Sequence, residues 1–248
     1  MTVLRALDLH KSFGGVRAVA GVSLDLRARE LVALIGPNGA GKSTCFDLLA
    51  GQLRPDAGQV LLDGKDIARR PARRIARLGL ARTFQTPAVF GSMTVRENVQ
   101  MALIAGERAI WRFGRPAAAL FRDPADALLA QVGMAPQADR GAGVLPYGDL
   151  KRLELAIALA ARPRVLLMDE PTAGTALGER GALIRLVRSL VDDHGLAVLF
   201  TEHDMAVVFD VADRVLVMDR GQLIASGDPE AVRRDPRVRE VYLGADPC

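Results

Sequence analysis

Residues 31–51 read LVALIGPNGAGKSTCFDLLAG, and the rest of the chain can be interpreted outward from this stretch. Apolar residues 31–35 have the character of a buried strand, a glycine-rich turn follows, and a helix is predicted to begin near Lys42. Residues 36–43 fit the phosphate-binding pattern G-x-x-x-x-G-K-[ST], in the strand, loop and helix context that this pattern requires. The stretch therefore predicts a nucleotide-binding site, and an ordinary glycine-rich turn is the weaker interpretation.

The residue types in this loop match what a bound phosphate requires. Glycines let backbone N–H groups turn towards the phosphates, and the N-terminus of a helix adds partial positive charge. Lys42 can reach the β and γ phosphates, and the hydroxyl of Ser43 can bind Mg²⁺. The predicted nucleotide-binding residues of this stretch are Gly36, Pro37, Asn38, Gly39, Ala40, Gly41, Lys42, Ser43 and Thr44.

Length and composition limit the class of protein. With 248 residues, half of them hydrophobic, the chain can form one substantial core with an insertion rather than two independent domains. The net charge of +4 comes from scattered arginines, and the cluster at residues 69–77 is interpreted as a solvated helix face rather than a nucleic-acid surface. Cys45 and Cys248 resemble neither a metal site nor a disulfide framework, which indicates a reducing compartment.

The distribution of apolar residues indicates where the protein resides. The N-terminus lacks the pattern of a secretory signal, and no apolar run approaches the roughly 20 residues that span a bilayer. We therefore expect a cytoplasmic protein. If a membrane is involved, a partner must span it.

An antiparallel edge is predicted around the phosphate-binding loop. Residues 3–9 and 22–26 alternate between apolar and polar, with a glycine pair between them, and residues 60–64 end in an Asp-Gly turn. Phe13 lies beside the glycine pair and could stack on an adenine base, whereas a core-filling role is an equal alternative. Residues 75–81 lead into another short strand, which ends at the amide of Gln85.

Residues 94–161 have a helical pattern. Thr94 is a candidate helix N-cap, with Glu97 three residues later. Trp111 and Phe113 lie among arginines in this region, a patch that we interpret as packing within a helical lobe rather than a surface for a partner.

Two acids follow a continuous apolar strand at residues 164–168. Asp169 could hold Mg²⁺ through water, and Glu170 could polarise an attacking water, the two tasks that hydrolysis of a phosphoanhydride needs beside the loop. Capping of the next helix is the weaker interpretation. His203 follows the next buried strand, residues 196–200, and would face the same crevice if the two strands are parallel neighbours.

Taken together, these motifs resemble those of an ATP-binding cassette (ABC) ATPase from end to end. GPNGAGKST matches the Walker A motif, Gln85 the Q-loop glutamine, LPYGD the signature, VLLMDE the Walker B motif with its catalytic glutamate, and His203 the switch histidine. LHKSFGGVRAV, ARTFQTPAVFGSMTVRENV, Tyr147, TEHDM and DPRVREVYLG are similar to ATP-binding subunits of branched-chain amino acid importers. Related importers of urea or short amides carry similar cassettes.

The resemblance implies an α/β fold with a P-loop NTPase (RecA-like) core, an antiparallel β edge and an inserted α-helical subdomain. The core would span about residues 1–87 and 163–227, the helical subdomain about 88–162, and a C-terminal tail about 228–248. All would belong to a single ABC ATPase domain.

The resemblance also implies roles for residues and partners. Glu170, His203 and Gln85 would be catalytic, Ser43, Gln85 and Asp169 would hold Mg²⁺, and Phe13, Tyr147 and Gly148 would join the loop in binding ATP. Two cassettes, identical or different, would sandwich two ATP molecules, with Tyr147 and Gly148 facing the partner's ATP. Transmembrane permease subunits and, indirectly, a periplasmic substrate-binding protein would complete an importer at the cytoplasmic face of the inner membrane. The alternatives are a soluble ABC ATPase without a transport role and a regulatory cassette that binds ATP without hydrolysing it.

The chain departs from the family at the groups that would face the partner's ATP. Where the common signature reads LSGGQ, this chain has Pro146, Tyr147 and Asp149 in place of the serine, a glycine and the glutamine, and Ala176 replaces a polar residue of the D-loop. Backbone N–H groups of Tyr147 and Gly148 and the positive end of the following helix remain available to an anion. We therefore expect the altered signature to function.

Overall fold

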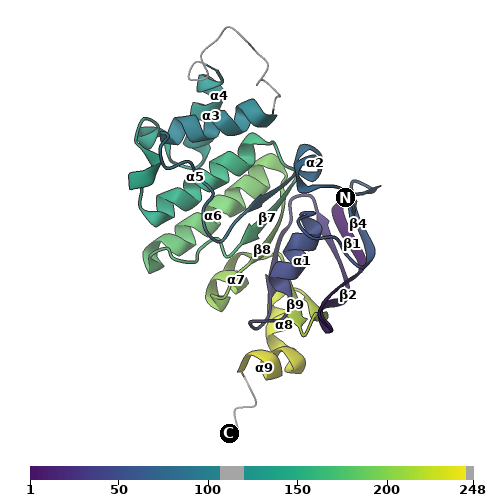
Figure 1. Ribbon diagram of the computed structural model, residues 1–248. Coiled ribbons are helices and arrows are strands. Elements are labelled where there is room, and N and C mark those ends of the chain that lie inside the picture. The colour runs from purple at the N-terminus through teal and green to yellow at the C-terminus, as the bar shows by residue number, and fades with distance from the viewer. Residues whose placement is uncertain (107–119, 244–248) are drawn as a thin grey trace.

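The computed structural model describes residues 1–106 and 120–243, and in this part of the chain the strands form two sheets (Figure 1). The strands are β1 (Thr2–Phe13), β2 (Val16–Arg27), β3 (Leu31–Ile35), β4 (Ala57–Leu62), β5 (Lys65–Asp66), β6 (Leu80–Thr83), β7 (Val165–Asp169), β8 (Ala197–Thr201), β9 (Arg214–Asp219) and β10 (Gln222–Gly227). One sheet has the order β10-β9-β3-β8-β7-β6, and the other the order β2-β1-β4-β5.

Helices surround the larger sheet and form a separate lobe. They are α1 (Lys42–Leu49), α2 (Ala72–Arg77), α3 (Val95–Gly106), α4 (Arg122–Gln131), α5 (Tyr147–Ala160), α6 (Leu177–His194), α7 (Met205–Val211), α8 (Pro229–Arg234) and α9 (Pro236–Leu243), with 3-10 turns η3 (Ala135–Gln137) and η4 (Ala142–Val144). None of these described helices is long and apolar enough to cross a bilayer.

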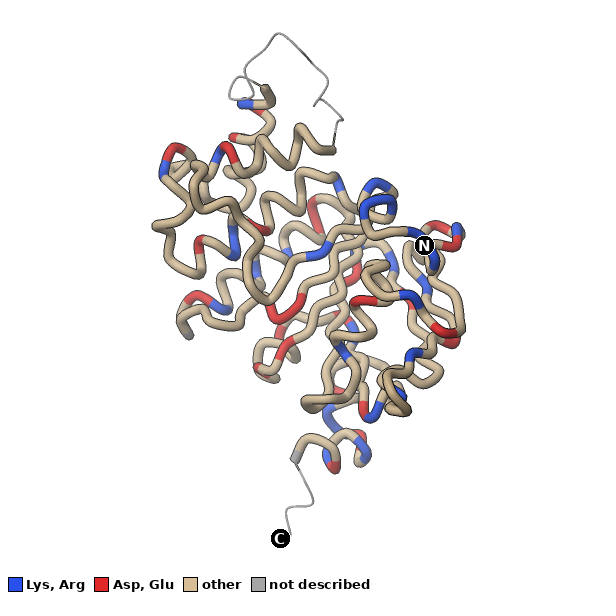
Figure 2. Tube along the Cα trace, in the orientation of Figure 1, with Lys and Arg blue, Asp and Glu red and all other residues tan. Residues whose placement is uncertain are grey.

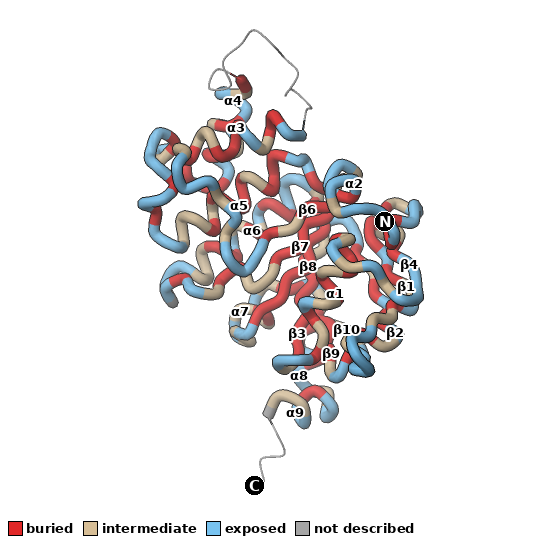
Figure 3. The backbone as a smooth tube through the Cα atoms, in the orientation of Figure 1, coloured by how far each residue is buried: buried red, intermediate tan, exposed pale blue. Residues whose placement is uncertain are grey.

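The larger sheet is buried on both faces, as its apolar strands predict (Figure 3). Along β3, residues 31, 33 and 35 pack in a core shared with α3, α4, α5 and α6. Residues 32 and 34 pack in a second core, between this sheet, α1 and the antiparallel sheet. Successive side chains of β3 therefore pack into two different cores. This packing on both faces fixes the position of the loop that follows β3.

Parallel pairing brings the ends of several strands to one edge of the sheet. β3 pairs in parallel with β8 and β9, β8 with β7, and β7 with β6. In this register Asp169, the last residue of β7, is the partner of Thr201, the last residue of β8. The acids at the end of β7, Asp169 and Glu170, and the residues after β8 consequently lie at the same edge, where ligands bind in open α/β sheets.

The antiparallel edge is confirmed. β1 and β2 form a hairpin around Gly14 and Gly15, and β4 turns into β5 at residues 63–64. The helical pattern is also present: α3, α4 and α5 pack on one another and form the upper lobe in Figure 1. Thr94 N–H donates to Glu97 Oε2 at 2.8 Å, and Glu97 N–H donates to Thr94 Oγ1 at 3.2 Å, so the predicted cap precedes α3.

Two sequence predictions concern features near this lobe. The arginine cluster at 69–77 lies in and before α2 and is exposed, as expected for a solvated helix face (Figure 2). The aromatic patch at Trp111 and Phe113 lies outside the described residues. All strands that the structure describes lie outside residues 88–162. The division into core and helical subdomain stays a prediction.

Candidate functional site

A cavity of about 440 Å³ lies where the ends of β7 and β8 meet the start of α1. Its lining combines the phosphate-binding loop with the acids after β7 and a rim of cationic residues. The lining residues are Val16, Arg17, Ala18, Asn38, Gly39, Ala40, Gly41, Lys42, Ser43, Thr44, Asp169, Glu170, His203 and Arg220. The structure thus brings together most of the predicted nucleotide-binding residues and four of the predicted catalytic or metal-binding residues, Ser43, Asp169, Glu170 and His203.

Two glycines of the loop are required by close contact with neighbouring backbone. Gly36 has a φ of 156°, and a Cβ there would lie 2.2 Å from the carbonyl oxygen of Met218. Gly41 caps α1 in the left-handed region with a φ of 100°, and a Cβ there would lie 2.1 Å from the carbonyl oxygen of Ala18. The loop can follow its path between β9 and β2 only because both positions lack a side chain.

Lys42 lies over its own loop. Its Nζ donates to the carbonyl oxygens of Gly36 at 2.6 Å and Pro37 at 3.1 Å. Burial lowers the pKa of Lys42, and the negative charges of Glu170 and Asp169 oppose that shift. The ammonium group is therefore positioned between the loop and the carboxylates, where an anionic phosphate would be attracted.

Thr201 joins the two acids at the end of β7, Asp169 and Glu170. Its hydroxyl accepts a hydrogen bond from Glu170 N–H at 3.0 Å and donates to Asp169 Oδ1 at 2.8 Å. Glu170 has a φ of 47°, a conformation that costs a non-glycine residue energy and is often found at functional sites. The sequence signal for this role of Thr201 was a polar residue at the end of the buried strand β8. The sequence analysis did not use that signal.

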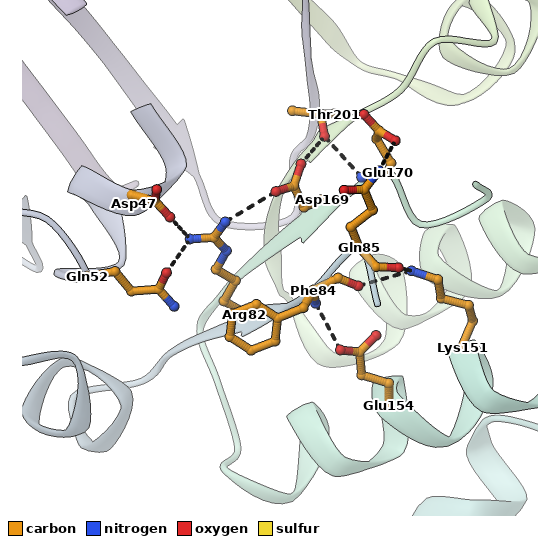
Figure 4. A network of polar contacts seen from close by, with 10 residues as sticks. All are labelled: Asp47, Gln52, Arg82, Phe84, Gln85, Lys151, Glu154, Asp169, Glu170 and Thr201. Atoms are coloured by element: carbon orange, nitrogen blue, oxygen red, sulfur yellow. Dashed lines mark hydrogen bonds and ion pairs between the residues drawn. The ribbon is translucent and has the colours of Figure 1, made fainter. Parts of the chain in front are cut away.

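The carboxylate of Glu170 is held from both sides. His203 Nε2 lies 2.8 Å from Oε1, and Gln85 Nε2 donates to Oε2 at 3.1 Å. The three predicted catalytic residues, from three different segments of the chain, therefore meet at one carboxylate. Although Gln85 is not part of the cavity lining, its side chain reaches the site through Glu170 (Figure 4).

A buried acid supports the backbone at His203. Glu202, 4% exposed, accepts hydrogen bonds from Thr172 N–H at 2.8 Å, Thr172 Oγ1 at 2.6 Å and His203 N–H at 3.1 Å. These bonds tie the segment after β7 to the segment after β8. The sequence analysis gave Glu202 no role, because its partner Thr172 lies 30 residues away in the sequence.

Arg82 connects the phosphate-loop helix to the acid pair (Figure 4). Its Nη1 lies 2.5 Å from Asp47 Oδ1 and its Nη2 lies 3.2 Å from Asp169 Oδ2, while its side chain is 9% exposed. The guanidinium also lies near the rings of Phe46 and Phe84. Arg82 and Thr201 therefore hold different oxygens of Asp169, an arrangement that the sequence did not reveal.

The remaining predicted nucleotide-binding residues do not belong to the lining of this cavity; they are Gly36, Pro37, Phe13, Tyr147 and Gly148. Phe13 is half-exposed near the tip of the β1–β2 hairpin, with Lys11 Nζ 5.5 Å from its ring, and does not belong to the lining. Tyr147 and Gly148 begin α5, and Tyr147 Oη donates to the carbonyl oxygen of Gln85 at 2.8 Å. Two cations that were not predicted, Arg17 and Arg220, lie at the cavity instead and add positive charge.

The donors in the cavity fit a hard cation. The Ser43 hydroxyl and the Asp169 carboxylate lie in the same lining and could supply oxygen ligands. Mg²⁺ prefers such oxygens and is usually held by one or two carboxylates together with substrate phosphates and water. The loop, the cationic rim and these oxygen donors together define the class of protein as a P-loop nucleoside triphosphatase.

Comparisons with known proteins narrow this class. The family model described as ABC transporter matches residues 19–173, and the model described as Branched-chain amino acid ATP-binding cassette transporter matches residues 222–247. The chain is 39% identical to the high-affinity branched-chain amino acid transport ATP-binding protein BraF of Pseudomonas aeruginosa, over 98% of both chains. It is 40% identical to the corresponding protein LivG of Salmonella typhimurium, again over 98% of both chains.

A solved structure agrees with these relatives. The ADP conformation of MJ1267, an ATP-binding cassette of an ABC transporter, superimposes with a TM-score of 0.87 at 33% identity, covering 98% of this chain and 99% of that one. The chain therefore belongs to the ABC transporter family, and it is an ATP-binding ATPase of that family. The predicted family and fold class are confirmed.

Proposed function

We propose that this chain is the ATP-hydrolysing subunit of an importer for branched-chain amino acids. The observation that carries the proposal is the similarity over nearly the whole chain to BraF and LivG, both named for branched-chain amino acid transport, together with the family match at residues 222–247. An importer of urea or short amides is the alternative that the sequence left open.

The partners follow from this proposal. Transmembrane permease subunits carry the amino acid, and a second ABC ATPase subunit, identical or different, completes the pair of ATP sites. A periplasmic substrate-binding protein supplies the amino acid, and this chain lies peripherally at the cytoplasmic face of the inner membrane. ATP binding draws the two cassettes together, hydrolysis separates them, and the permease alternates between two conformations as a result.

Within one chain, we assign roles from the geometry of the cavity. The loop N–H groups, the N-terminus of α1 and Lys42 bind the phosphates. Ser43 and Asp169 from the cavity lining, together with Gln85 beside it, would hold Mg²⁺, which would neutralise developing phosphate charge. Glu170 accepts a proton from the attacking water, and His203 Nε2, 2.8 Å from Glu170 Oε1, keeps that carboxylate oriented.

The other predicted binding residues act at or near the edges of the nucleotide. Phe13 stacks on the adenine base, which is consistent with a half-exposed ring on the hairpin that also contributes Val16 to the cavity. Tyr147 and Gly148 present their backbone N–H groups and the N-terminus of α5 to the partner's ATP.

A transport assay tests this function. The chain is assembled with its permease and ATPase partner in lipid vesicles, and ATP turnover is measured with the loaded substrate-binding protein. We expect leucine, isoleucine or valine to stimulate turnover and to accumulate in the vesicles, whereas urea and acetamide do not. Stimulation by urea or acetamide alone would establish the alternative.

The matched control is Lys42→Ala in the same assembly. This variant removes the lysine that reaches the β and γ phosphates, so both ATP binding by the chain and amino acid uptake should be lost. Uptake that persists with Lys42→Ala would contradict the role assigned to the loop.

A further inference from the structure

Helix α5 contacts the segment around Gln85 through one of its faces (Figure 4). Tyr147, Lys151 and Glu154 are spaced four and three residues apart, so they lie on the same side of the helix. Lys151 Nζ donates to the carbonyl oxygens of Phe84 at 3.0 Å and Gln85 at 2.7 Å. Glu154 Oε1 accepts from Phe84 N–H at 2.8 Å.

The two charged residues of this face are almost fully buried. Lys151 is 5% exposed and Glu154 is 4% exposed. Lysine and glutamate are rarely buried to this extent unless they are paired or hydrogen-bonded, because burial removes the hydration of the charge. Burial lowers the pKa of Lys151 and raises that of Glu154, while the charge of each opposes the shift of the other. Their hydrogen bonds are made to the backbone rather than to other side chains. The two buried residues therefore hold the backbone of residues 84–88 in its observed conformation.

Gln85 itself has little other support. It lies two residues beyond the end of β6 and is exposed. Its carbonyl oxygen is held by Lys151 and by Tyr147 Oη, and its side chain donates to Glu170 Oε2 at 3.1 Å. The backbone of Gln85 is thus attached to the helical lobe, whereas its side chain contacts the acid after β7 in the core.

We propose that Lys151 and Glu154 are positioning residues that hold Gln85 against Glu170, so that α5 and the Gln85 segment move as one unit. This inference rests on the proposed roles of Gln85 and Glu170. The N-terminus of α5 carries Tyr147 and Gly148, the residues assigned to the partner's ATP. A shift of α5 at the partner's ATP is therefore transmitted through Lys151 and Glu154 to the contact between Gln85 and Glu170, in the site of the chain's own ATP.

A double-mutant cycle tests the proposal in the assembled transporter. Lys151→Met and Gln85→Ala are compared singly and together, with ATP turnover and ATP affinity as the two measurements. We expect Lys151→Met to lower turnover by about ten- to a hundredfold, the range that a misplaced catalytic contact can cost, with little change in affinity. In the Gln85→Ala background, Lys151→Met should cause no further loss, because both changes remove the same contact.

Arg96→Met is the matched control. Arg96 is also largely buried in the helical lobe, where it pairs with Asp126 and Asp139. Among the described residues, it makes no hydrogen bond or ion pair with residues 84–88. Its effect on turnover should be the same with and without Gln85→Ala. Any loss that comes from a loosened helical lobe is identified in this way.

Amide hydrogen exchange of the full chain provides a readout that does not depend on activity. Glu154→Ala should speed exchange at Phe84 N–H, which loses its acceptor, whereas Glu154→Gln retains a carbonyl oxygen and should keep most of the protection and turnover. Arg96→Met should leave exchange at Phe84 unchanged. If Lys151→Met fails to fold, the same cycle is run with Glu154→Ala.

Two results would overturn the inference. In the first, the losses of ATP turnover caused by Lys151→Met and by Gln85→Ala multiply in the double variant, which would show that Lys151 only supports the fold. In the second, Lys151→Met and Glu154→Ala both keep wild-type turnover, which would show that neither residue positions Gln85. A different failure, wild-type turnover in Gln85→Ala itself, would refute the catalytic role proposed for Gln85.

Discussion

At the scale of single residues, the site converges on Glu170. Gln85, His203 and Thr201 all contact this residue, and its backbone is held at a φ of 47°. Such a conformation persists only where the surrounding structure enforces it. These contacts hold the Glu170 side chain in place. A substitution that keeps the shape of this side chain but removes its charge therefore tests the carboxylate itself.

Glu170→Gln tests whether this carboxylate activates water. We expect ATP binding to be retained and turnover to fall by about 10²-fold or more, because an amide cannot accept the proton of the attacking water. Turnover is measured in the assembled transporter and ATP affinity by equilibrium titration. Wild-type turnover would leave the acid pair with only a structural role.

Arg82→Met tests the buried bridge between Asp47 and Asp169. The free energy of unfolding should fall by about 3 kcal/mol or more, because removing one partner leaves two acids without their compensating charge. Urea denaturation of the full chain measures this change. Arg164→Met is the control, because Arg164 is largely exposed and its pair with Asp63 should contribute less than about 1 kcal/mol. Equal losses in the two variants would contradict the bridge.

At the scale of elements, the start of α3 depends on reciprocal bonds between Thr94 and Glu97. The N–H and the hydroxyl of Thr94 both donate to Glu97, and these bonds lower the pKa of Glu97. A carboxyl whose pKa is lowered in the folded state stabilises that state above its unfolded pKa. This contribution is lost as the pH falls through the lowered pKa.

Thr94→Ala should therefore destabilise the chain by about 1 kcal/mol at neutral pH, the usual cost of losing an N-cap. The difference between the variant and the wild type should shrink in acid, because protonated Glu97 is neutral and accepts the hydroxyl bond less strongly. Urea denaturation at pH 7 and at about pH 3, well below the unfolded pKa of a glutamate, gives both values. A difference that does not change with pH would mean that the bond to Glu97 contributes nothing to the cap.

At the scale of the whole molecule, the groups that we assign to the chain's own ATP and those that we propose for the partner's ATP lie in different places. The cavity holds the loop, the acids and His203, whereas Pro146, Tyr147 and Gly148 lie at the start of α5. Pro146 occupies the N-cap position of α5 and provides no side-chain cap. The signature of this chain therefore lacks both a hydroxyl and an N–H at residue 146.

Pro146→Ser restores a hydroxyl at that position. Because a hydrogen bond to a charged group contributes about 1.5 to 3 kcal/mol, we expect faster turnover at the partner's ATP and no change at the site containing Lys42. The measurement uses assemblies in which one site at a time is silenced by a lysine mutation in its phosphate-binding loop. An effect at the Lys42 site would refute the head-to-tail pairing, and no effect would show that the N–H groups of Tyr147 and Gly148 suffice.

The sequence by itself determined the loop, the buried strands, the antiparallel edge and the family. These features are local: glycine spacing, alternation and runs of apolar residues act within a few positions of one another, so they can be recognised along the chain. The acids after β7 and His203 were predicted to meet for a similar reason, since parallel strands place their carboxyl ends at one edge.

Only the tertiary structure decided which side chains support these groups. Arg82 reaches Asp169 across 87 positions, Glu154 reaches Phe84 across 70, and Thr201 reaches Asp169 across 32. Each contact depends on how the helical lobe and the strands pack, and a charged or polar residue in the sequence does not specify its distant partner. Burial in the folded chain determines these hydrogen-bond partners, because a charged or polar group that is removed from water needs a hydrogen bond within the protein.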